Sequence, residues 1–437
     1  MNLLALRSHN AALVLDLLRS AGDEGISRLE LAERTGLTPQ AVSKITARLR
    51  EDGLAAEAGR RASTGGKPRT VLRLVPEAGH AVGVHLDRDE VRVVLVDLRG
   101  AVVAERRAAL DLGAGSEAVL GAVRDAVAGV LGGTRPGPGG GDLASREGLG
   151  GGGLVSREGP GGGGLVSREG PGGGDLASRQ GLGGDLASRQ GLGAGDLVSR
   201  YGPAARDRSS GAGLAGVDPT LLGVGVALPG PLDHGRGVLH RVTGFPEWDG
   251  FPLRDALAER LGVPVVVDKD TNAAALGLAA GGERGSFAYL HLGTGLGAGL
   301  VIGGGVHRGA RTGAGEFGHQ VIQLDGPPCT CGNRGCVEAL CLGAVARGDL
   351  DEAARVLGAG AANLVGLLDI DVVLLGGRTV AAAPSAFTDG VGAVLLARAR
   401  RTGQDAVPVR VAAGGDGTVA VGAAQLVLGP VFGRGGG

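Results

Sequence analysis

Aromatic side chains make up only 2% of this 437-residue sequence, which also holds only four cysteines, one tryptophan and one methionine. It has three lysines, Lys44, Lys67 and Lys269, and a formal net charge of −1. That balance gives no overall field that would attract a nucleic acid, so any basic surface must be local. The sequence has no run of 18 or more apolar residues, which argues against a membrane-spanning helix.

Three charged residues, Arg7, Asp16 and Arg19, interrupt the apolar pattern near the start of the sequence. Such charges break the apolar core that a signal peptide needs, and they suit an amphipathic helix. The cysteines are clustered rather than scattered, which does not fit a disulfide framework. These features predict a cytoplasmic protein that makes no contact with a membrane.

Three of the cysteines, Cys329, Cys331 and Cys336, gather in one glycine-rich stretch, and His319 lies ten residues before the first of them. The glycines allow tight turns, so the three sulfurs can converge. Three thiolates and an imidazole match a tetrahedral zinc site, and a closed shell of four ligands indicates a structural ion. The alternative is a cluster of unliganded buried thiols. Cys341 fits a core position in the next helix, although it could replace His319 as a ligand.

The same stretch resembles a known family. The pattern G-E-x-G-H, which includes Glu316, is followed by C-x-C-G-x-x-G-C-x-E, which ends at Glu338. This resembles the signature of the ROK family, which contains sugar kinases and sugar-responsive transcription regulators. The resemblance implies an α/β fold with an actin-like, ribonuclease H-like body of two lobes. It also implies that a sugar would bind between the lobes, in contact with Asp270, Glu316, His319 and Glu338.

Residues 1–75 predict a small DNA-binding domain. A capping box of Ser27 and Glu30 indicates the start of a second helix, and Thr38 caps a third helix that begins at Pro39. Two helices joined by a short turn at this spacing are typical of a helix-turn-helix. The third helix directs polar side chains outward. The candidate DNA contacts on it are Thr38, Gln40, Ser43, Lys44 and Arg48.

A wing is expected after the third helix, with two short strands flanking a basic, glycine-rich tip. Residues 1–75 contain 12 Lys and Arg against 8 Asp and Glu, whereas the whole chain has a net charge of −1. Positive charge is therefore concentrated where DNA phosphates would lie, and Lys67 and Arg69 are the candidate contacts. ROK regulators resemble this segment, including the Gly-Gly-Lys-Pro tip. The alternative is a protein-interaction module with a solvated charged face.

The segment 80–131 predicts alternating strands followed by a helix. In the ROK family the corresponding hairpin carries an Asp-x-Gly-Gly-Thr phosphate loop. Here the matching positions are His85, Asp87, Arg88 and Asp89. Without the glycines the backbone cannot approach a phosphate closely, and the two carboxylates would repel it, which Arg88 could offset only in part. We therefore expect the body to have lost ATP-dependent kinase activity, so that the protein is not an enzyme.

A low-complexity segment occupies residues 132–215, where a unit similar to GGGDLASREGL recurs. Its leucines repeat every 10 or 11 residues, a period that could indicate a coiled coil or a solenoid. Each unit, however, has several glycines and about two apolar residues, too few to offset the entropy of ordering the chain. We expect a disordered Gly-rich insertion between the two parts of the body, 80–131 and 216–429.

The resemblance resumes after the insertion. Asp270 falls where ROK kinases place the base that deprotonates the sugar hydroxyl, with a plain helix N-cap as the alternative. Lys269 replaces a usual sugar-contacting Asn, and Leu278 replaces a usual Glu. Lys269 would favour an anionic or phosphorylated ligand, or fill the pocket itself. Residues 293–299, GTGLGAG, match the second phosphate-contacting loop of the family.

Together these features predict a sugar-responsive, DNA-binding transcription regulator, and analogy with the family favours a repressor. The expected partners are double-stranded operator DNA and a sugar or sugar-phosphate effector, in a homodimer or homotetramer. Asp270 would then be a vestigial base. Two alternatives stay open, namely an active ROK kinase that phosphorylates a hexose with ATP, and a ligand-independent DNA-binding protein.

Overall fold

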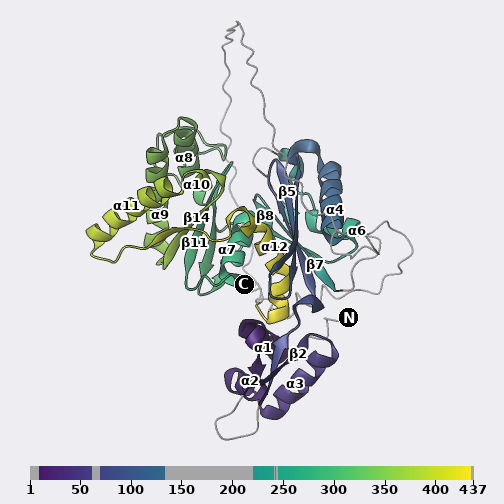
Figure 1. Ribbon diagram of the computed structural model, residues 1–437. Helices are drawn as coiled ribbons and strands as arrows, with labels where there is room; N and C mark the ends of the chain where they lie inside the picture. Colours follow the sequence, from purple (N-terminus) through teal and green to yellow (C-terminus); the bar gives the residue numbers. More distant parts are fainter. Residues whose placement is uncertain (1–8, 62–68, 133–219, 241, 243–244, 435–437) are drawn as a thin grey trace, which may run out of the picture. The chain divides into compact units, whose positions relative to one another are not determined.

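The computed structural model describes residues 9–61, 69–132, 220–240, 242 and 245–434. These residues form a helical module with a three-stranded sheet and an α/β body with two five-stranded sheets (Figure 1). The predicted winged helix-turn-helix and α/β body are both confirmed. The predicted insertion lies outside the described residues except for Gly132, which ends a helix. No helix in the described part of the chain is long and apolar enough to cross a membrane.

The N-terminal module combines three helices with a small antiparallel sheet. The helices are α1 (His9–Ala21), α2 (Arg28–Thr35) and α3 (Pro39–Glu51). The strands pair in the order β1 (Ile26–Ser27), β3 (Arg69–Leu74) and β2 (Ala55–Arg61). Ser27 and Glu30 form the predicted capping box, and Thr38 accepts a hydrogen bond from the amide of Ala41. These caps set the turn between α2 and α3, so the polar face of α3 points outward.

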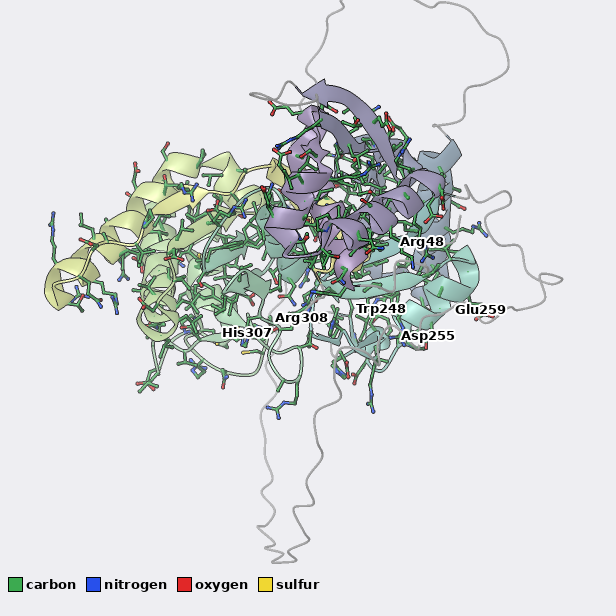
Figure 2. All side chains as sticks on the ribbon, turned by 90° about the horizontal axis from the view of Figure 1, so that it is seen from below. Arg48, Trp248, Asp255, Glu259, His307 and Arg308 are labelled. Carbon is green, nitrogen blue, oxygen red and sulfur yellow. The ribbon has the colours of Figure 1, made fainter. Side chains whose placement is uncertain are left out.

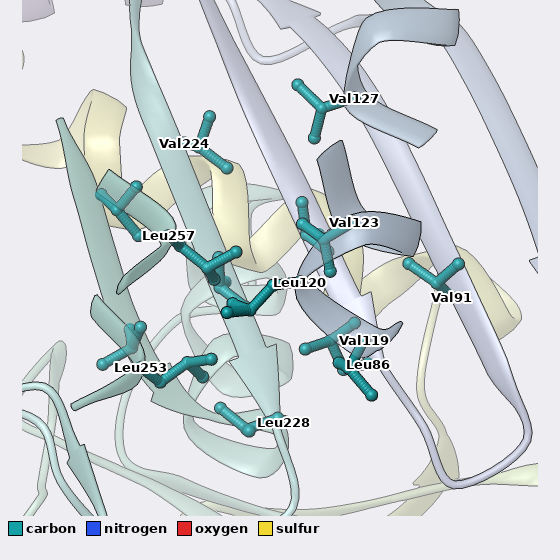
Figure 3. Close-up of a cluster of buried hydrophobic side chains, with 14 of the residues drawn as sticks. Leu86, Val91, Val119, Leu120, Val123, Val127, Val224, Leu228, Leu253 and Leu257 are labelled. Atoms are coloured by element: carbon teal, nitrogen blue, oxygen red, sulfur yellow. The ribbon is translucent and has the colours of Figure 1, made fainter. Parts of the chain in front are cut away.

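The first sheet of the body mixes antiparallel and parallel pairs. Its order is β10 (Val265–Lys269), β7 (Leu221–Leu228), β4 (His80–Leu86), β5 (Glu90–Asp97) and β6 (Val102–Ala109). The predicted hairpin is the antiparallel part, β4 to β6, while β7 and β10 run parallel to β4. Helices α4 (Ser116–Gly132) and α6 (Leu253–Leu261) pack their leucines and valines on this sheet (Figure 3). Trp248 is buried in the same core and donates from Nε1 to the carbonyl of Leu112 at 3.0 Å.

The second sheet lies in the C-terminal part of the chain. Its order is β13 (Gly305–Val306), β12 (Leu296–Ile302), β11 (Phe287–Leu292), β14 (Val372–Gly376) and β15 (Val409–Val411). The helices that share a core with this sheet are α8 (Val337–Ala346), α9 (Leu350–Leu368), α10 (Arg378–Ala382) and α11 (Pro384–Thr402). Because β11 and β14 are parallel, the β11–β12 turn and the carboxyl end of β14 lie at the same end of the sheet.

Two closely packed helices, α7 (Asp270–Ala280) and α12 (Thr418–Leu428), connect the two sheets. A Cβ on Gly422 would lie 1.7 Å from the carbonyl oxygen of Ala273, so the two backbones touch. On its other side α12 packs on β4 and β7, where a Cβ on Gly83 would lie 1.9 Å from the carbonyl oxygen of Ala420. Glycine is therefore required at these contacts, and the N-terminus of α7 is held in a fixed position beside both sheets.

Candidate functional site

A cavity of about 490 Å³ opens where loops from both sheets meet. Its walls come from the ends of β4 and β10, the β11–β12 turn, the segment around Glu316 and the start of α8. The structure brings together all four residues that the family resemblance predicted to contact a sugar. They are Asp270, Glu316, His319 and Glu338. Their proposed role in binding stays a prediction, but their shared position in one cavity meets its geometric requirement.

Asp270 is the first residue of α7, and its carboxylate accepts a hydrogen bond from the amide of Thr271 at 2.6 Å. The N-cap position belongs to Lys269, so the N-cap interpretation of Asp270 is wrong by one residue. Burial at the cavity raises the pKa of the Asp270 carboxyl, while nearby His291 opposes that shift. A carboxyl group in this environment is well placed to exchange hydrogen bonds with a hydroxyl-rich ligand.

Lys269 turns into the wall of the cavity, and its side chain is only 3% exposed. Its ammonium group donates to the carbonyl of Ala314 at 2.5 Å and to Glu316 Oε1 at 3.0 Å. The Lys269 ammonium therefore has an anionic partner within the protein. Of the two roles expected for Lys269, this geometry favours the one in which it fills part of the pocket.

Glu338 lies in the first turn of α8 and reaches the glycine-rich turn between β11 and β12. Its Oε2 accepts a hydrogen bond from the amide of Leu296 at 2.8 Å. A Cβ on Gly295 would lie 3.3 Å from the same oxygen. Glu338 therefore fixes the position of this turn as well as lining the cavity, so its loss would disturb both.

The turn between β4 and β5 occupies the position expected for the first phosphate loop. Asp87 and Asp89 of this turn both pair with Arg378, which follows β14. Arg378 Nη2 donates to Asp87 at 2.9 Å and to Asp89 at 3.1 Å, and Nη1 donates to Asp89 at 3.2 Å. The hydrogen bond from Arg378 holds the pKa of Asp89 below its usual range. From the sequence, Arg88 was the residue expected to offset the negative charges of the two aspartates. In the structure the Arg88 guanidinium lies over the ring of Phe245.

The glycines of the GTGLGAG segment have a packing role of their own. A Cβ on Gly299 would lie 2.0 Å from the carbonyl oxygen of Thr271, and a Cβ on Gly297 would lie 3.0 Å from the Thr271 side chain. Larger residues at these positions would collide with the first turn of α7. Gly297 and Gly299 are therefore explained by packing of β12 on α7, and their presence is not by itself a sign of phosphate binding.

Two histidines, His85 and His291, also line the cavity. The sequence matched His85 to the first phosphate loop, whereas His291 carries no signal in the sequence because it lies within an apolar strand. Tyr289 Oη lies 2.9 Å from His291 Nδ1, which fixes the orientation of that ring. Burial lowers the pKa of His85 to about 4, so its imidazole is neutral near pH 7. His85 therefore offers a neutral ring donor and acceptor beside the carboxylates.

The predicted metal ligands also come together. His319, Cys329, Cys331 and Cys336 offer ligand atoms that all lie within 4.8 Å of one another. The sulfurs of Cys331 and Cys336 are 3.6 Å apart, and Cys329 Sγ lies 3.7 Å from His319 Nδ1. Ligand atoms about 2.3 Å from a tetrahedral ion are separated by about 3.8 Å, so the four residues could hold a metal. Gly335, with a φ of 65°, supplies the turn before Cys336.

Cys341 lies in the core that the second sheet shares with α8, α9, α10 and α11, and it is not among these ligand atoms. It is fully buried, and its thiol donates to the carbonyl of Ala353 at 3.5 Å. Burial raises the pKa of Cys341 to about 12. A thiol in this environment stays protonated, which fits the core interpretation made from the sequence.

The candidate DNA contacts of α3 lie on its exposed face. Thr38 is the N-cap, and the other four side chains on this face are exposed, with Arg48 labelled in Figure 2. They are Gln40, Ser43, Lys44 and Arg48. The opposite face of α3 is buried through Val42 and Leu49. Arg69 is exposed at the start of β3, and Lys67 lies outside the described residues.

Comparisons with known proteins agree with this architecture. A family model described as "ROK family" matches residues 215–350, and one described as "Winged helix-turn-helix DNA-binding" matches residues 13–55. The chain is 33% identical over 224 residues to a kanosamine kinase of Amycolatopsis mediterranei, an alignment that covers 44% of this chain and 71% of the relative. The chain belongs to the ROK family. The predicted family is therefore confirmed.

Relatives within the ROK family include proteins named as repressors and as kinases. A putative xylose repressor of Caldicellulosiruptor sp. is 30% identical over 202 residues, covering 36% of this chain and 50% of the relative. A glucokinase of Thermotoga maritima is 42% identical over 121 residues, covering 27% of this ROK chain and 38% of the relative. The chain thus spans half or less of the length of these curated relatives.

Solved structures of ROK proteins show the same fold. One is a ROK family transcriptional regulator described as a homolog of the E. coli MLC protein, with a TM-score of 0.63 and 17% identity. That alignment covers 98% of each chain. Another is a ROK family glucokinase from Streptomyces griseus, with a TM-score of 0.52 and 22% identity over 80% of this chain and 99% of the other. At these identities the likeness concerns the fold alone.

The pair of Lys269 and Glu316 generates a stability prediction. Glu316→Gln keeps the size of the side chain but removes the negative charge beside a buried ammonium group. We expect the free energy of unfolding to fall by about 1–2 kcal/mol, measured by urea denaturation. The matched control is Glu283→Gln, because Glu283 pairs with the exposed Arg410 and should contribute less than about 0.5 kcal/mol. Equal, small losses in both variants would show that Lys269 does not need its partner.

Proposed function

We propose that this protein is a DNA-binding transcription regulator, and specifically a repressor, whose body binds a sugar or sugar derivative without phosphorylating it. The pairing of Asp87 and Asp89 with Arg378 carries the proposal, because it occupies the turn where a phosphate loop would lie. The winged helix-turn-helix supplies the means of contacting DNA. Relatives named as xylose repressors support the combination.

The geometry of the β4–β5 turn opposes phosphate transfer. Transfer requires backbone N–H groups and cations that surround the transferred phosphate. Here Asp87 and Asp89 present carboxylates, and the guanidinium that neutralises them is already engaged on both. A triphosphate would have to displace these ion pairs and would then face two carboxylates, each repelling it by about 1 kcal/mol or more. Asp270 is therefore a vestigial base that now serves as a ligand contact.

The effector site in this proposal is the cavity that holds Asp270, Glu316, His319 and Glu338. Carboxylates and an imidazole accept and donate hydrogen bonds to ring hydroxyls, and their fixed positions select the stereochemistry of the ligand. Binding would be transmitted through α7, whose first residue is Asp270 and whose backbone touches α12. The effector is a sugar or a sugar phosphate.

The proposed cofactor is one structural zinc ion held by His319, Cys329, Cys331 and Cys336. When bound, such an ion supplies a rigid cross-link rather than a reacting water, because four protein ligands close its shell. His319 lines the cavity while belonging to the metal cluster, and Glu338 follows Cys336 by two residues. The ion would therefore hold two ligand-contacting side chains in place.

In this proposal the chain has three parts. Residues 1–75 form the DNA-binding domain, residues 80–131 and 216–429 form the ROK body, and residues 132–215 are an insertion between its two parts. The partners are double-stranded operator DNA and the sugar effector, in a homodimer or homotetramer located in the cytoplasm.

One observation favours a second candidate function, a DNA-binding protein that responds to no ligand. Within the cavity, Glu316 Oε1 accepts a hydrogen bond from the Lys269 ammonium group, so this oxygen is already engaged and is less available to a sugar hydroxyl. A panel of sugars and sugar phosphates in a thermal shift assay separates the two functions, because only a ligand that binds the native state raises the melting temperature. A shift with any member supports the effector role.

The zinc proposal predicts a specific loss on mutation. Cys331→Ser should reduce bound zinc from about one ion per chain to near zero and lower the melting temperature, because the metal contributes directly to folding. Elemental analysis of the purified protein measures the metal. Cys341→Ser is the matched control, since that thiol lies in the core and should leave the zinc content unchanged. Equal metal content in Cys331→Ser and the parent protein would contradict the assignment.

The DNA proposal predicts different effects for base and phosphate contacts. With an operator selected from a random duplex pool, Lys44→Ala or Gln40→Ala should lower the preference over unrelated DNA about tenfold. Arg69→Ala should weaken binding to all sequences and reduce the salt slope by about one. Fluorescence anisotropy at several salt concentrations measures both quantities. Arg236→Ala, a highly exposed arginine of the body, is the control and should change neither. An unchanged preference in the α3 variants would refute the placement of α3 on DNA.

A further inference from the structure

The charged side chains that line the 490 Å³ cavity are mostly acidic. Four carboxylates and two cationic side chains belong to its wall. The carboxylates are those of Asp87, Asp270, Glu316 and Glu338, and the cations are those of Arg88 and Lys269. Water screens charges poorly inside a cavity, so the groups that have no partner within the protein decide which ligand charge the cavity favours.

Both cations of the cavity wall have partners within the protein. The Lys269 ammonium group donates to Glu316 Oε1 and to the carbonyl of Ala314, and its side chain is almost fully buried. The Arg88 guanidinium lies 5.4 Å from the centroid of the Phe245 ring. A phosphate group on a ligand would therefore have to compete with Glu316 for Lys269, so this arrangement does not favour an anionic ligand.

Asp270 and Glu338, by contrast, form no ion pair within the described part of the chain. Each accepts a hydrogen bond from one backbone amide, Asp270 at Oδ1 from Thr271 and Glu338 at Oε2 from Leu296. The other oxygen of each carboxylate is left for a ligand. Burial raises the pKa of the Asp270 carboxyl, because its charged form has lost water that the neighbouring groups replace only in part.

We infer that the effector carries a protonated amine, and that Asp270 binds its ammonium group. A neutral hydroxyl can donate to the same carboxylate oxygen, but only an ammonium group also compensates the charge. An amino sugar is the ligand class that combines this group with ring hydroxyls for the remaining contacts. A sugar phosphate would instead bring a further anion beside Asp270 and Glu338.

This inference deepens the proposed function and rests on it, because it names the chemical class of the effector that would occupy the same cavity. Its test therefore has to separate two failures. In one, the cavity binds a sugar of another class; in the other, the cavity binds no sugar.

Isothermal titration calorimetry on the full chain compares matched ligands at about pH 6.5, where an amine is protonated. The probes are glucose, galactose and mannose, the same hexoses with an amine at carbon 2 or carbon 3, the N-acetyl derivatives of these amines and the hexose 6-phosphates. At least one amino hexose should bind about tenfold or more tightly than its parent hexose, its N-acetyl derivative and the matching 6-phosphate.

The other outcomes each contradict a different statement. A neutral or phosphorylated probe that binds at least as tightly as every amino hexose would overturn the inference and leave the proposed effector role intact. An absence of binding by all probes would overturn the effector role and the inference with it.

Two variants change the charge at the contact in opposite directions. Asp270→Asn keeps the size of the side chain but removes its charge, so the amine should bind within about twofold of the parent hexose. Lys269→Gln leaves Glu316 without its cation and should raise the preference for the amine about threefold or more. Asp255→Asn, at an exposed position of α6, is the matched control and should change nothing.

The ratio of the two affinities separates a charge effect from general damage to the cavity, which would weaken the amine and the hexose alike. An amine preference that Asp270→Asn leaves unchanged, or that Lys269→Gln lowers, would overturn the assignment of Asp270. Melting temperatures establish that each variant is folded.

Discussion

Arg378 shares its guanidinium between two carboxylates that lie two residues apart on the β4–β5 turn. Without it, Asp87 and Asp89 would repel each other and any other anion that approached. With it, the turn is tied to the residue that follows β14 in the other sheet. The interaction therefore joins the two lobes at the place where an ATP-dependent sugar kinase would hold a phosphate. Under the proposed function, the cavity beyond it binds a ligand and does not transfer a phosphate.

The floor of that cavity is held by backbone packing. Gly422 brings α12 against α7, and Gly299 brings β12 against the first turn of α7. These contacts fix Asp270 and Lys269 at the start of α7, where Lys269 reaches Glu316. Helix α7 is thus the element on which the proposed ligand contact Asp270, the Lys269–Glu316 pair and the packing between the sheets converge. A ligand that moved Asp270 would have to move α12 with it.

Local sequence signals predicted much of this structure. The capping box of Ser27 and Glu30 and the cap at Thr38 depend on residues three positions apart, so the helices of the N-terminal module were predictable. The spacing of the cysteines likewise predicted their convergence. The partner of Asp87 and Asp89 was not predictable, because Arg378 lies 291 residues beyond Asp87 along the chain. The packing role of Gly297 and Gly299 was also missed, because their contact with Thr271 of α7 exists only in the folded chain.

The most direct test of the central claim is a phosphoryl-transfer assay on the full chain. ADP release is measured with ATP, Mg²⁺ and a panel of hexoses, amino sugars and their derivatives, with the Asp270→Asn variant in parallel. The account predicts no turnover above background for either protein with any sugar, because the phosphate loop is replaced by Asp87, Asp89 and Arg378. Sugar-dependent turnover that Asp270→Asn abolishes would contradict it and would make this chain a kinase.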